Sequence, residues 1–353
     1  MTREQYLDVD NVGRESLRAP TMRDVAAVAG VSLKTVSRVV NGEGGVSDGL
    51  ALRVRDAVRV LGYRPNMTAS NLRRADQKTA TIGLLLEDVG NPFSSALHRA
   101  IEDVAGPRGT LVFAGSSDED TEREADVLRA FAVRRVDGLI VVPANQEMTR
   151  LAHERRLGTP IVFVDRRAAL REVDSVTVDN RLGIAGAVRH LASYGHRRIA
   201  YLGDRSRIWT ASERYFGYLE GLSAEGMRLD PDLVRQDVYG VDAAEAVTRE
   251  LLALGADAPT AILAGQNLVT IGAIRALQGL GLQRRVALVG FDDFPLADLL
   301  EPPVTVVAQD PVALGRIAAE LLFARLDGDR GPGQHVVVPT RLVPRGSGEL
   351  LAP

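Results

Sequence analysis

Short apolar runs alternate with amphipathic stretches over most of the chain. The apolar runs predict strands at residues 82–86, 110–114, 138–142, 161–164, 199–203, 261–264 and 286–291. Helix-period patterns lie between these runs, so the rhythm favours β–α–β units over hairpins. Such units form parallel sheets with helices on both faces, and their ligands bind at the carboxyl ends of the strands. About 270 residues of this pattern predict two doubly wound lobes.

The segment before residue 80 has a different pattern, which predicts three short helices. A capping-box-like start at Thr21 and a stop at Gly30 delimit the first helix. Ser32 is expected to cap the second helix, and Ser47 a third at residues 48–61. An all-α headpiece is therefore predicted at residues 20–64.

Polar segments flank this headpiece. Residues 1–19 have no apolar period, which predicts a disordered tail. Residues 65–79 are predicted to be a hinge helix and linker, in which residues 66–72 form one or two turns. A helix this short is marginal in isolation, because nucleation costs more than a few hydrogen bonds return. The remaining residues, 80–348, form the predicted core.

The charged residues are unevenly distributed between the predicted headpiece and the rest of the chain. The chain has 353 residues, of which 45% are hydrophobic and 25% charged, as expected of a folded α/β protein. Residues 20–78 carry ten Lys or Arg against five Asp or Glu, a net charge of +5, and the remainder carries −8. A polyanion would be drawn to the first segment. On charge alone, a solvated basic surface is the more common explanation.

Several functional classes lack their sequence signals. There is no Cys, which excludes disulfides and thiolate metal sites. The five His lack metal spacing, and no phosphate loop or nucleophile elbow occurs, so we expect no metal, no cofactor and no catalytic residue. No apolar stretch resembles a signal peptide or a membrane span, and we expect a cytoplasmic, nucleoid-associated protein without membrane partners. A doubly wound enzyme and a free solute-binding protein are the alternatives.

Ordered motifs point to a family. Residues 21–42 read TMRDVAAVAGVSLKTVSRVVNG, and shorter motifs follow in order at residues 46–47, 61–66, 91–93, 136–140, 195–199, 290–293 and 309–311. In these motifs the chain resembles the lactose-repressor (LacI/GalR) family along nearly its whole length. The resemblance implies a transcription regulator, a repressor by default, with a helix-turn-helix headpiece, a hinge helix and a periplasmic-binding-protein-like core. It also implies a homodimer that reads near-palindromic operator DNA.

The same resemblance divides the core. It implies that one lobe spans about residues 80–178 and 310–330. The other lobe then takes about residues 180–308 and 331–348.

The second headpiece helix carries the expected DNA-reading residues, because in a helix-turn-helix its first residues reach base edges in the major groove. Arg38 can bond a guanine bidentately, Lys34 can donate to a guanine or a phosphate, and Leu33 can contact a thymine methyl group. The resemblance assigns base reading to the same positions; an exposed helix charge is the alternative for Arg38. Short polar side chains are expected to hold phosphates: Thr21, Ser32, Thr35, Ser37 and Asn41.

The resemblance also assigns roles in the hinge. Leu72 is expected to wedge into a minor-groove step and kink the DNA. Ala69 would allow the two hinge helices of a dimer to approach closely. Packing of Leu72 on the core is the alternative.

Strand-end polar residues predict a pocket for a sugar-like effector between the lobes. The resemblance places Asp165 and Arg166 at a strand-end ligand position, has Arg214 bind ligand oxygens and has Asp292 accept from hydroxyls. The remaining candidates are Gln266 and Gln309, and the aromatics Phe93 and Trp209, with Tyr239 as a third ring. A structural ion pair or core aromatic is the alternative at each position.

The chain departs from the family pattern at two places. Leu50 and Ala51 replace the usual threonine and basic residue, which removes one phosphate contact that Arg53 or Arg55 is expected to supply. Residues 266–267 are Gln-Asn where the family usually has Asn-Asp, so one carboxylate is lost. The effector therefore stays open between a sugar, including a pentose or modified sugar, and a nucleoside.

Overall fold

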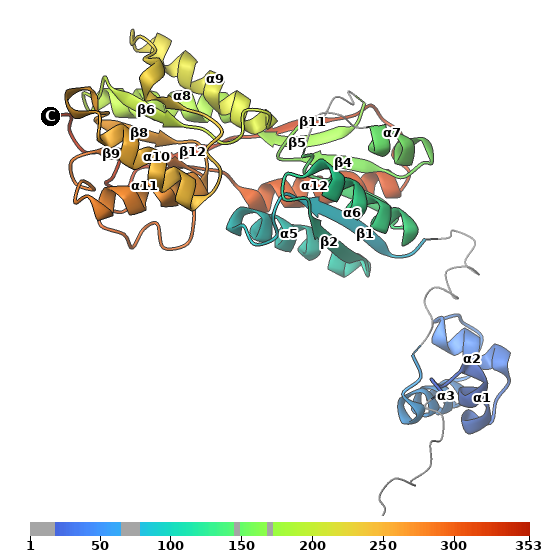
Figure 1. Cartoon of the computed structure of the whole chain (residues 1–353). Helices are drawn as coiled ribbons and strands as arrows, with labels where there is room; N and C mark the ends of the chain where they lie inside the picture. The colour runs from blue at the N-terminus through green and yellow to red at the C-terminus, as the bar shows by residue number, and fades with distance from the viewer. Residues whose placement is uncertain (1–17, 65–77, 145–148, 168–171) are drawn as a thin grey trace, which may run out of the picture. The chain divides into compact units, whose positions relative to one another are not determined.

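The computed structural model describes residues 18–64, 78–144, 149–167 and 172–353 (Figure 1). The chain divides into two units, Met1–Thr79 and Ala80–Pro353, which we call the headpiece and the core. The predicted tail up to residue 17 and the predicted hinge residues Ala69 and Leu72 lie outside the described residues. Those predictions stay predictions.

The headpiece contains the three helices that the sequence predicts, at α1 (Met22–Ala29), α2 (Leu33–Val40) and α3 (Asp48–Leu61). Thr21 begins α1 with a capping box, in which its backbone N–H donates to Asp24 Oδ2 at 2.7 Å. Ser32 Oγ accepts from the backbone N–H of Thr35 at 3.1 Å and so caps α2. Ser47 stands at the N-cap of α3, as the sequence predicts, but its side chain makes no cap hydrogen bond.

A small apolar cluster joins these helices. Its buried members are Val25, Ala29, Val36, Val54, Ala57 and Tyr63. Gly62 ends α3 in the left-handed region at φ 61°, which lets the chain turn away from the helix. The helices of this unit are fixed by local caps and by one shared core.

The core contains two six-stranded sheets. The first has the order β11-β5-β4-β3-β1-β2 and is parallel throughout. Its strands are β1 (Thr81–Leu86), β2 (Leu111–Ser116), β3 (Gly138–Val141), β4 (Ile161–Val164), β5 (Asp174–Val178) and β11 (His335–Val338). In its register Leu84 of β1 lies between Ala114 and Ile140.

The second sheet has the order β12-β10-β9-β8-β6-β7, and only β12 runs antiparallel to its neighbour. Its strands are β6 (Ile199–Leu202), β7 (Val234–Arg235), β8 (Ala261–Ala264), β9 (Ala287–Phe291), β10 (Thr305–Ala308) and β12 (Arg341–Val343). We call the halves built on the two sheets the first and second lobes.

Helices cover both faces of each sheet, as predicted (Figure 1). The first lobe has α5 (Pro92–Ala105), α6 (Thr121–Val133), α7 (Thr149–Arg156) and α12 (Pro311–Leu326), and the second has α8 (Asn180–Ser193), α9 (Trp209–Ala224), α10 (Val241–Leu252) and α11 (Asn267–Gly279). Short 3₁₀ turns are η1 (Gly106–Arg108), η2 (Pro231–Leu233) and η3 (Gly255–Asp257). Alternation along β6 shows the two covered faces: Tyr201 packs with α8 and α9, and Leu202 packs with α10 and α11.

The chain passes between the lobes three times, after β5, after β10 and after β11. The expectation that residues 331–348 all belong to the second lobe is wrong for β11. This strand pairs in parallel with β5, with Val336 opposite Val176, and completes the first sheet before the chain returns to β12. No helix among the described residues is both long and apolar enough to cross a membrane.

Candidate DNA-reading surface and ligand pocket

The helix α2 buries one side and exposes the side expected to read DNA. Val36 is fully buried in the headpiece cluster, whereas Leu33 at the first helical position keeps 46% of its surface exposed. Lys34 is exposed beside it. The exposed part of the Leu33 side chain is therefore available for an apolar contact outside the chain.

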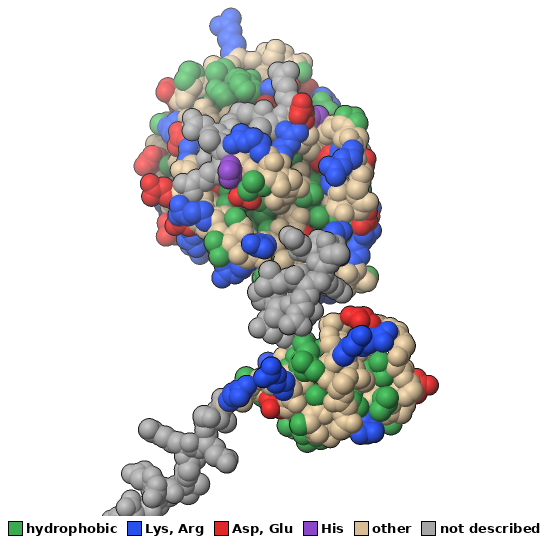
Figure 2. All heavy atoms as spheres, turned by 90° about the vertical axis from the view of Figure 1, so that its right-hand side faces the viewer, with side chains coloured by type: hydrophobic (Ala, Val, Ile, Leu, Met, Phe, Trp, Pro, Cys, Tyr) green, Lys and Arg blue, Asp and Glu red, His purple; other side chains and the backbone are tan. Residues whose placement is uncertain are grey.

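The predicted base readers border one groove of the headpiece. The groove is lined by Arg18, Thr21, Met22, Arg23, Leu33, Lys34, Ser37, Arg38 and Glu43. It thus gathers all three base-reading candidates and two phosphate-holding candidates, Thr21 and Ser37. On the face of the headpiece that Figure 2 shows, Lys and Arg side chains are spread over several places rather than gathered in one patch.

The remaining phosphate candidates, Ser32, Thr35 and Asn41, lie at the two ends of α2. Ser32 Oγ and Thr35 Oγ1 are 2.9 Å apart, and Asn41 Nδ2 donates to Ser37 Oγ at 3.3 Å. These hydroxyls and amides are ordered by one another at the surface of the unit. Such an arrangement suits contacts that fix register without reading sequence.

Two arginines of the headpiece are held by backbone carbonyls. Arg38 Nη2 donates to Gly44 O at 2.6 Å, which orients the guanidinium against the loop after α2. Arg53 Nη2 donates to Ala29 O at 2.5 Å and so closes the end of α1. Of the two substitutes expected for the lost phosphate contact, Arg53 therefore has a structural task, and the exposed Arg55 fits the role better.

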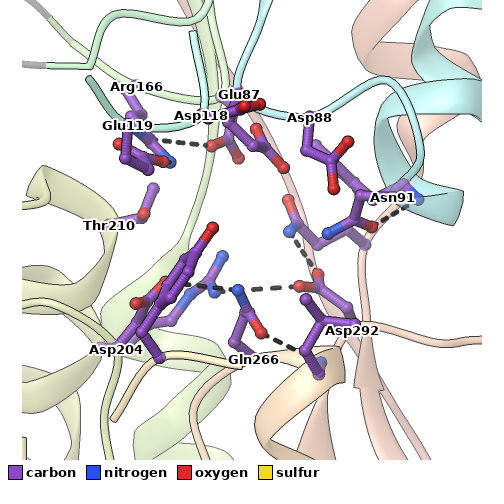
Figure 3. A pocket seen from close by; sticks show the side chains of 16 residues that line it. Glu87, Asp88, Asn91, Asp118, Glu119, Arg166, Asp204, Thr210, Gln266 and Asp292 are labelled. Carbon is purple, nitrogen blue, oxygen red and sulfur yellow. Dashed lines mark hydrogen bonds and ion pairs between the residues drawn. The ribbon is translucent and has the colours of Figure 1, made fainter. Parts of the chain in front are cut away.

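A polar pocket lies where the strands of both lobes end, as the sequence predicts for a doubly wound fold. Its lining is Glu87, Asp88, Asn91, Phe93, Asp118, Glu119, Asp165 and Arg166 from the first lobe, and Asp204, Thr210, Arg214, Tyr239, Gln266, Leu268, Asp292 and Gln309. Figure 3 shows Glu87, Asp88 and Asp118 on one side of the pocket and Asp204, Gln266 and Asp292 on the other.

Arg166 and Glu119 form a buried fork in the first lobe. Nη2 and Nη1 of Arg166 donate to Oε1 and Oε2 of Glu119 at 2.6 and 2.9 Å, and Nη1 also donates to Pro143 O at 3.1 Å. The two side chains are 7% and 5% exposed. Burial alone would lower the pKa of Arg166, but the charge and hydrogen bonds of Glu119 raise it. The guanidinium therefore stays charged.

Arg214 is held in the same manner from the second lobe. Its Nε donates to Asn180 Oδ1 at 2.7 Å and its Nη1 to Gly265 O at 2.8 Å, and its guanidinium lies 3.8 Å from the Phe291 ring centroid. Asp292 Oδ2 lies 3.8 Å from Arg214 Nη1, and Asp292 Oδ1 accepts from Gln309 Nε2 at 2.5 Å. This network presents a fixed cation and a fixed carboxylate to the pocket.

Two polar contacts join the lobes at the pocket. Asn267 Nδ2 donates to Asn91 Oδ1 at 2.9 Å, and both side chains are buried. Arg207 Nη2 donates to the backbone oxygen of Glu119 at 2.9 Å. The asparagine that replaces the family's usual carboxylate is thus an inter-lobe contact, not a lining residue.

Burial raises the pKa of several lining carboxyls. Burial raises the pKa of Glu87 to about 8, and Arg166 offsets part of this effect while Asp165 and Glu119 add to it. Burial likewise raises the pKa of Asp165, Asp204 and Asp292, each partly offset by Arg214. Carboxyls perturbed in this way and clustered in a cleft are typical of binding sites.

Backbone strain accompanies the same residues. Asp118, Glu119, Asp165 and Asp292 have φ values of 50°, 60°, 66° and 70°, in the region that side-chain-bearing residues rarely adopt. All four stand just after strands of the two sheets. Strain persists where the surrounding structure fixes a side chain for a purpose, so it marks the strand ends as a site.

The structure brings together most of the predicted effector residues: Phe93, Asp165, Arg166, Arg214, Gln266, Asp292, Gln309 and the third aromatic, Tyr239, line the pocket. Trp209 does not; its neighbour Thr210 lines the pocket instead, because α9 begins at Trp209 and directs the next position inward. The sequence reasoning missed Glu87, Glu119 and Asp204. All three stand just after strands β1, β2 and β6, which was the available signal.

A helix-turn-helix unit followed by a two-lobed core, with a polar pocket at the strand ends of both lobes, defines a DNA-binding transcription regulator with a periplasmic-binding-protein-like core. Comparisons with known proteins agree. Residues 21–66 match the bacterial regulatory proteins of the lacI family, and residues 188–348 match the periplasmic binding protein-like domain.

Relatives extend this match to the whole chain. The HTH-type transcriptional regulator RegA of Clostridium saccharobutylicum is 32% identical over 93% of this chain and 99% of its own length. A solved transcriptional regulator CelR–cellobiose complex is 31% identical, with coverage of 93% and 99% and a TM-score of 0.69. The lac repressor dimer bound to operator and the anti-inducer ONPF is 27% identical, with coverage of 94% and 99% and a TM-score of 0.83. The chain belongs to the lacI family of bacterial regulatory proteins.

Proposed function

We propose that two copies of the chain bind a near-palindromic operator and that a small hydroxylated effector, a sugar or a nucleoside, changes operator affinity from the pocket between the lobes. The observation that carries the proposal is this pocket, lined by strand ends of both lobes in a chain that also bears a helix-turn-helix. The proposal assigns the chain repression rather than catalysis and the nucleoid as its place of action. The cellobiose and operator complexes of its relatives support it.

On the DNA side, α2 enters the major groove with Leu33, Lys34 and Arg38 at the base edges. Thr21, Ser32, Thr35, Ser37 and Asn41 hold phosphates. The hinge residues Ala69 and Leu72 contact the minor groove, the leucine as a wedge. The half-sites lie about 34 Å apart, one helical turn, because each protomer supplies one headpiece.

On the effector side, Arg214 donates to ligand oxygens while Asp292 and Gln309 accept from hydroxyl groups. Asp165, Arg166 and Gln266 complete the polar lining, and Phe93 covers an apolar face of the ligand. A ligand that contacts both lobes stabilises the arrangement in which the lobes are closed on it. It shifts operator affinity only by its differential affinity for the two arrangements, typically about 1–3 kcal/mol.

Selection of bound fragments from random DNA by the full chain tests the DNA proposal. A two-fold-symmetric site, bound by a dimer in light scattering, is expected. Thermal stabilisation by sugars and nucleosides, followed by operator titrations with each hit, tests the effector proposal. Binding without sequence preference, or hits that leave operator affinity unchanged, would contradict it; an enzyme or a solute-binding protein would then fit better.

A further inference from the structure

The pocket lining contains more carboxylates than cations. Its acidic members are Glu87, Asp88, Asp118, Glu119, Asp165, Asp204 and Asp292, and its cations are Arg166 and Arg214. Asp88 and Asp118 are exposed, so water screens their charges. Glu119 is bound by Arg166, and Asp292 lies beside Arg214. Glu87, whose pKa burial raises to about 8, is protonated at neutral pH. Asp165 and Asp204 are left in excess within the pocket.

One of these carboxylates is buried with an oxygen that no donor reaches. Asp165 is 5% exposed, and among the residues that the structure describes none donates a hydrogen bond to its Oδ1. Its Oδ2 lies 3.5 Å from Arg166 Nε. The backbone fixes this carboxylate, since its own N–H donates to Val176 O at 2.8 Å and its φ is 66°. A buried acceptor kept without a donor is costly, so the position calls for a donor from outside the chain.

Two further side chains of the pocket lining also have a buried oxygen without a hydrogen-bond partner on any described residue. Glu87 Oε1 accepts from Ser94 Oγ at 3.2 Å, whereas its Oε2 meets no donor in the described ranges. Gln309 donates to Asp292, and its Oε1 likewise lacks a donor there. Three lining side chains thus carry an open oxygen, and one donor of the lining, Arg166 Nε at 3.5 Å from Asp165 Oδ2, is also without a hydrogen-bond partner among the described residues.

Two neighbouring arginines point their side-chain hydrogen-bonding groups at other partners than these carboxylates. Arg205 lies on the ring of Tyr239, 3.8 Å from its centroid, and Arg207 is bound to a backbone oxygen. Asp204 accepts from the Arg205 N–H at 2.7 Å and from Gln266 Nε2 at 3.3 Å, neither of which is a cation. Within the described part of the chain, no group of three or more acidic or His side chains could hold a metal ion.

We infer that the effector of the proposed function carries a protonated amine in addition to hydroxyl groups, as an amino sugar does. The inference rests on the proposed function and narrows its ligand class. Hydroxyl groups alone satisfy open acceptors, but they leave two carboxylates, Asp165 and Asp204, without a cation of their own in the pocket. An ammonium group donates three hydrogen bonds and balances charge, and charge-assisted bonds are about twice as strong as neutral ones.

Calorimetry on the full chain tests the inference with paired probes: glucose, galactose and mannose, their 2-amino counterparts, and the N-acetylated forms of those amines. At least one amine is expected to bind about tenfold or more tightly than both its neutral hexose and its N-acetylated form. Asp165→Asn keeps the shape and tolerates the positive φ. We expect it to reduce this preference by about tenfold, and Asp204→Asn to reduce it as well.

Glu122→Gln is the matched control, because Glu122 is an exposed carboxylate of the first lobe outside the pocket lining; it should keep the preference. The inference is overturned if no amine binds better than its neutral partners, if the preference survives both Asp165→Asn and Asp204→Asn, or if Ca²⁺ or Mg²⁺ displaces the amine. A neutral sugar that alters operator binding while the amines do nothing would leave the proposed function standing and refute the inference. Failure to bind any operator would refute the proposed function itself.

Discussion

The headpiece exposes its polar groups, whereas the core buries the polar groups that form its pocket. In the headpiece the hydroxyls and charges lie at the surface, and the capping bonds of α1 and α2 join residues three positions apart. In the core the polar groups that form the pocket are buried, and their bonds join residues far apart, such as Arg166 and Glu119, 47 positions from each other. The headpiece is thus built to meet a solvated polyanion, and the core to enclose a small ligand away from water.

This difference has energetic consequences. Surface charges are screened by salt, so each one contributes little to stability and acts mainly on DNA. Buried charges interact at low dielectric, and removal of one partner leaves the other uncompensated. Substitutions in the core pocket should therefore cost folding free energy and ligand binding, whereas substitutions of the polar residues on the exposed side of α2 should cost mainly DNA binding.

The largest effect is expected from Arg166→Ala, which leaves Glu119 buried without its cation. We expect the free energy of unfolding of the core to fall by about 3–5 kcal/mol. Denaturant titration followed by the fluorescence of Trp209, the single tryptophan and a core residue, measures this loss. Arg181→Ala is the control: its pair with Glu213 is 2.8 Å long but its side chain is 43% exposed, so about 1 kcal/mol or less is expected. Equal losses of unfolding free energy in Arg166→Ala and Arg181→Ala would contradict the contrast between buried and exposed charges.

Asp292→Ala should remove the effector response. The side chain lies beside Arg214 and accepts from Gln309, so its loss removes an acceptor for the ligand and should weaken effector binding by about 1.5–3 kcal/mol. Operator affinity without effector should change little, because α2 belongs to the other unit. Ligand calorimetry and operator titration check the two parts, and an intact ligand response would show that the pocket assignment is wrong.

Arg38→Ala should weaken operator binding by about 1–3 kcal/mol and relax the preference at one base pair in each half-site. Ser37→Ala is the comparison, since loss of a phosphate contact should weaken operator and random DNA alike. Fluorescence anisotropy on matched operator and random duplexes separates the two patterns. If Arg38→Ala weakens both duplexes by the same factor, Arg38 is not a base reader.

The last prediction concerns the dependence of core stability on pH, where the effect is small for each pH unit. Burial raises the pKa of Glu87 to about 8 from an ordinary value of 4.5, and Ser94, Arg166, Asp165 and Glu119 are the groups that act on it. Between these values the folded core binds more protons than the unfolded chain, so this group's contribution to stability falls as pH rises from 5 to 8. The slope is at most about 1.4 kcal/mol per pH unit, the value for one proton. Glu87→Gln should flatten the decline in melting temperature; parallel curves for both proteins would refute this.

Local rules determined the headpiece. Thr21 and Ser32 cap, Gly30 and Gly62 terminate, and an apolar residue on every third or fourth position faces one core, so the helix bounds follow from neighbours a few residues apart. The missing cap hydrogen bond of Ser47 shows the limit of that reasoning, because a suitable side chain still has to adopt the right rotamer. The strand-end rule likewise placed Asp165 and Asp292 in one pocket, because parallel strands share the edge at which they end. Arg214, inside α9, was placed there only by the family resemblance.

Tertiary structure alone decided the rest. The sequence does not give the order of strands in a parallel sheet, so β11 joined the first lobe against expectation, and Asn267 became a bridge to Asn91 instead of a pocket residue. Nor does it show which carboxylates share a cation: Glu119 is neutralised by Arg166, whereas Asp165 keeps an oxygen that no described residue binds. The physical reason is the sequence separation over which each kind of interaction acts. Helix caps and periodicity act over one or two turns, while pairing of buried charges depends on crossovers that bring residues dozens of positions apart to the same edge.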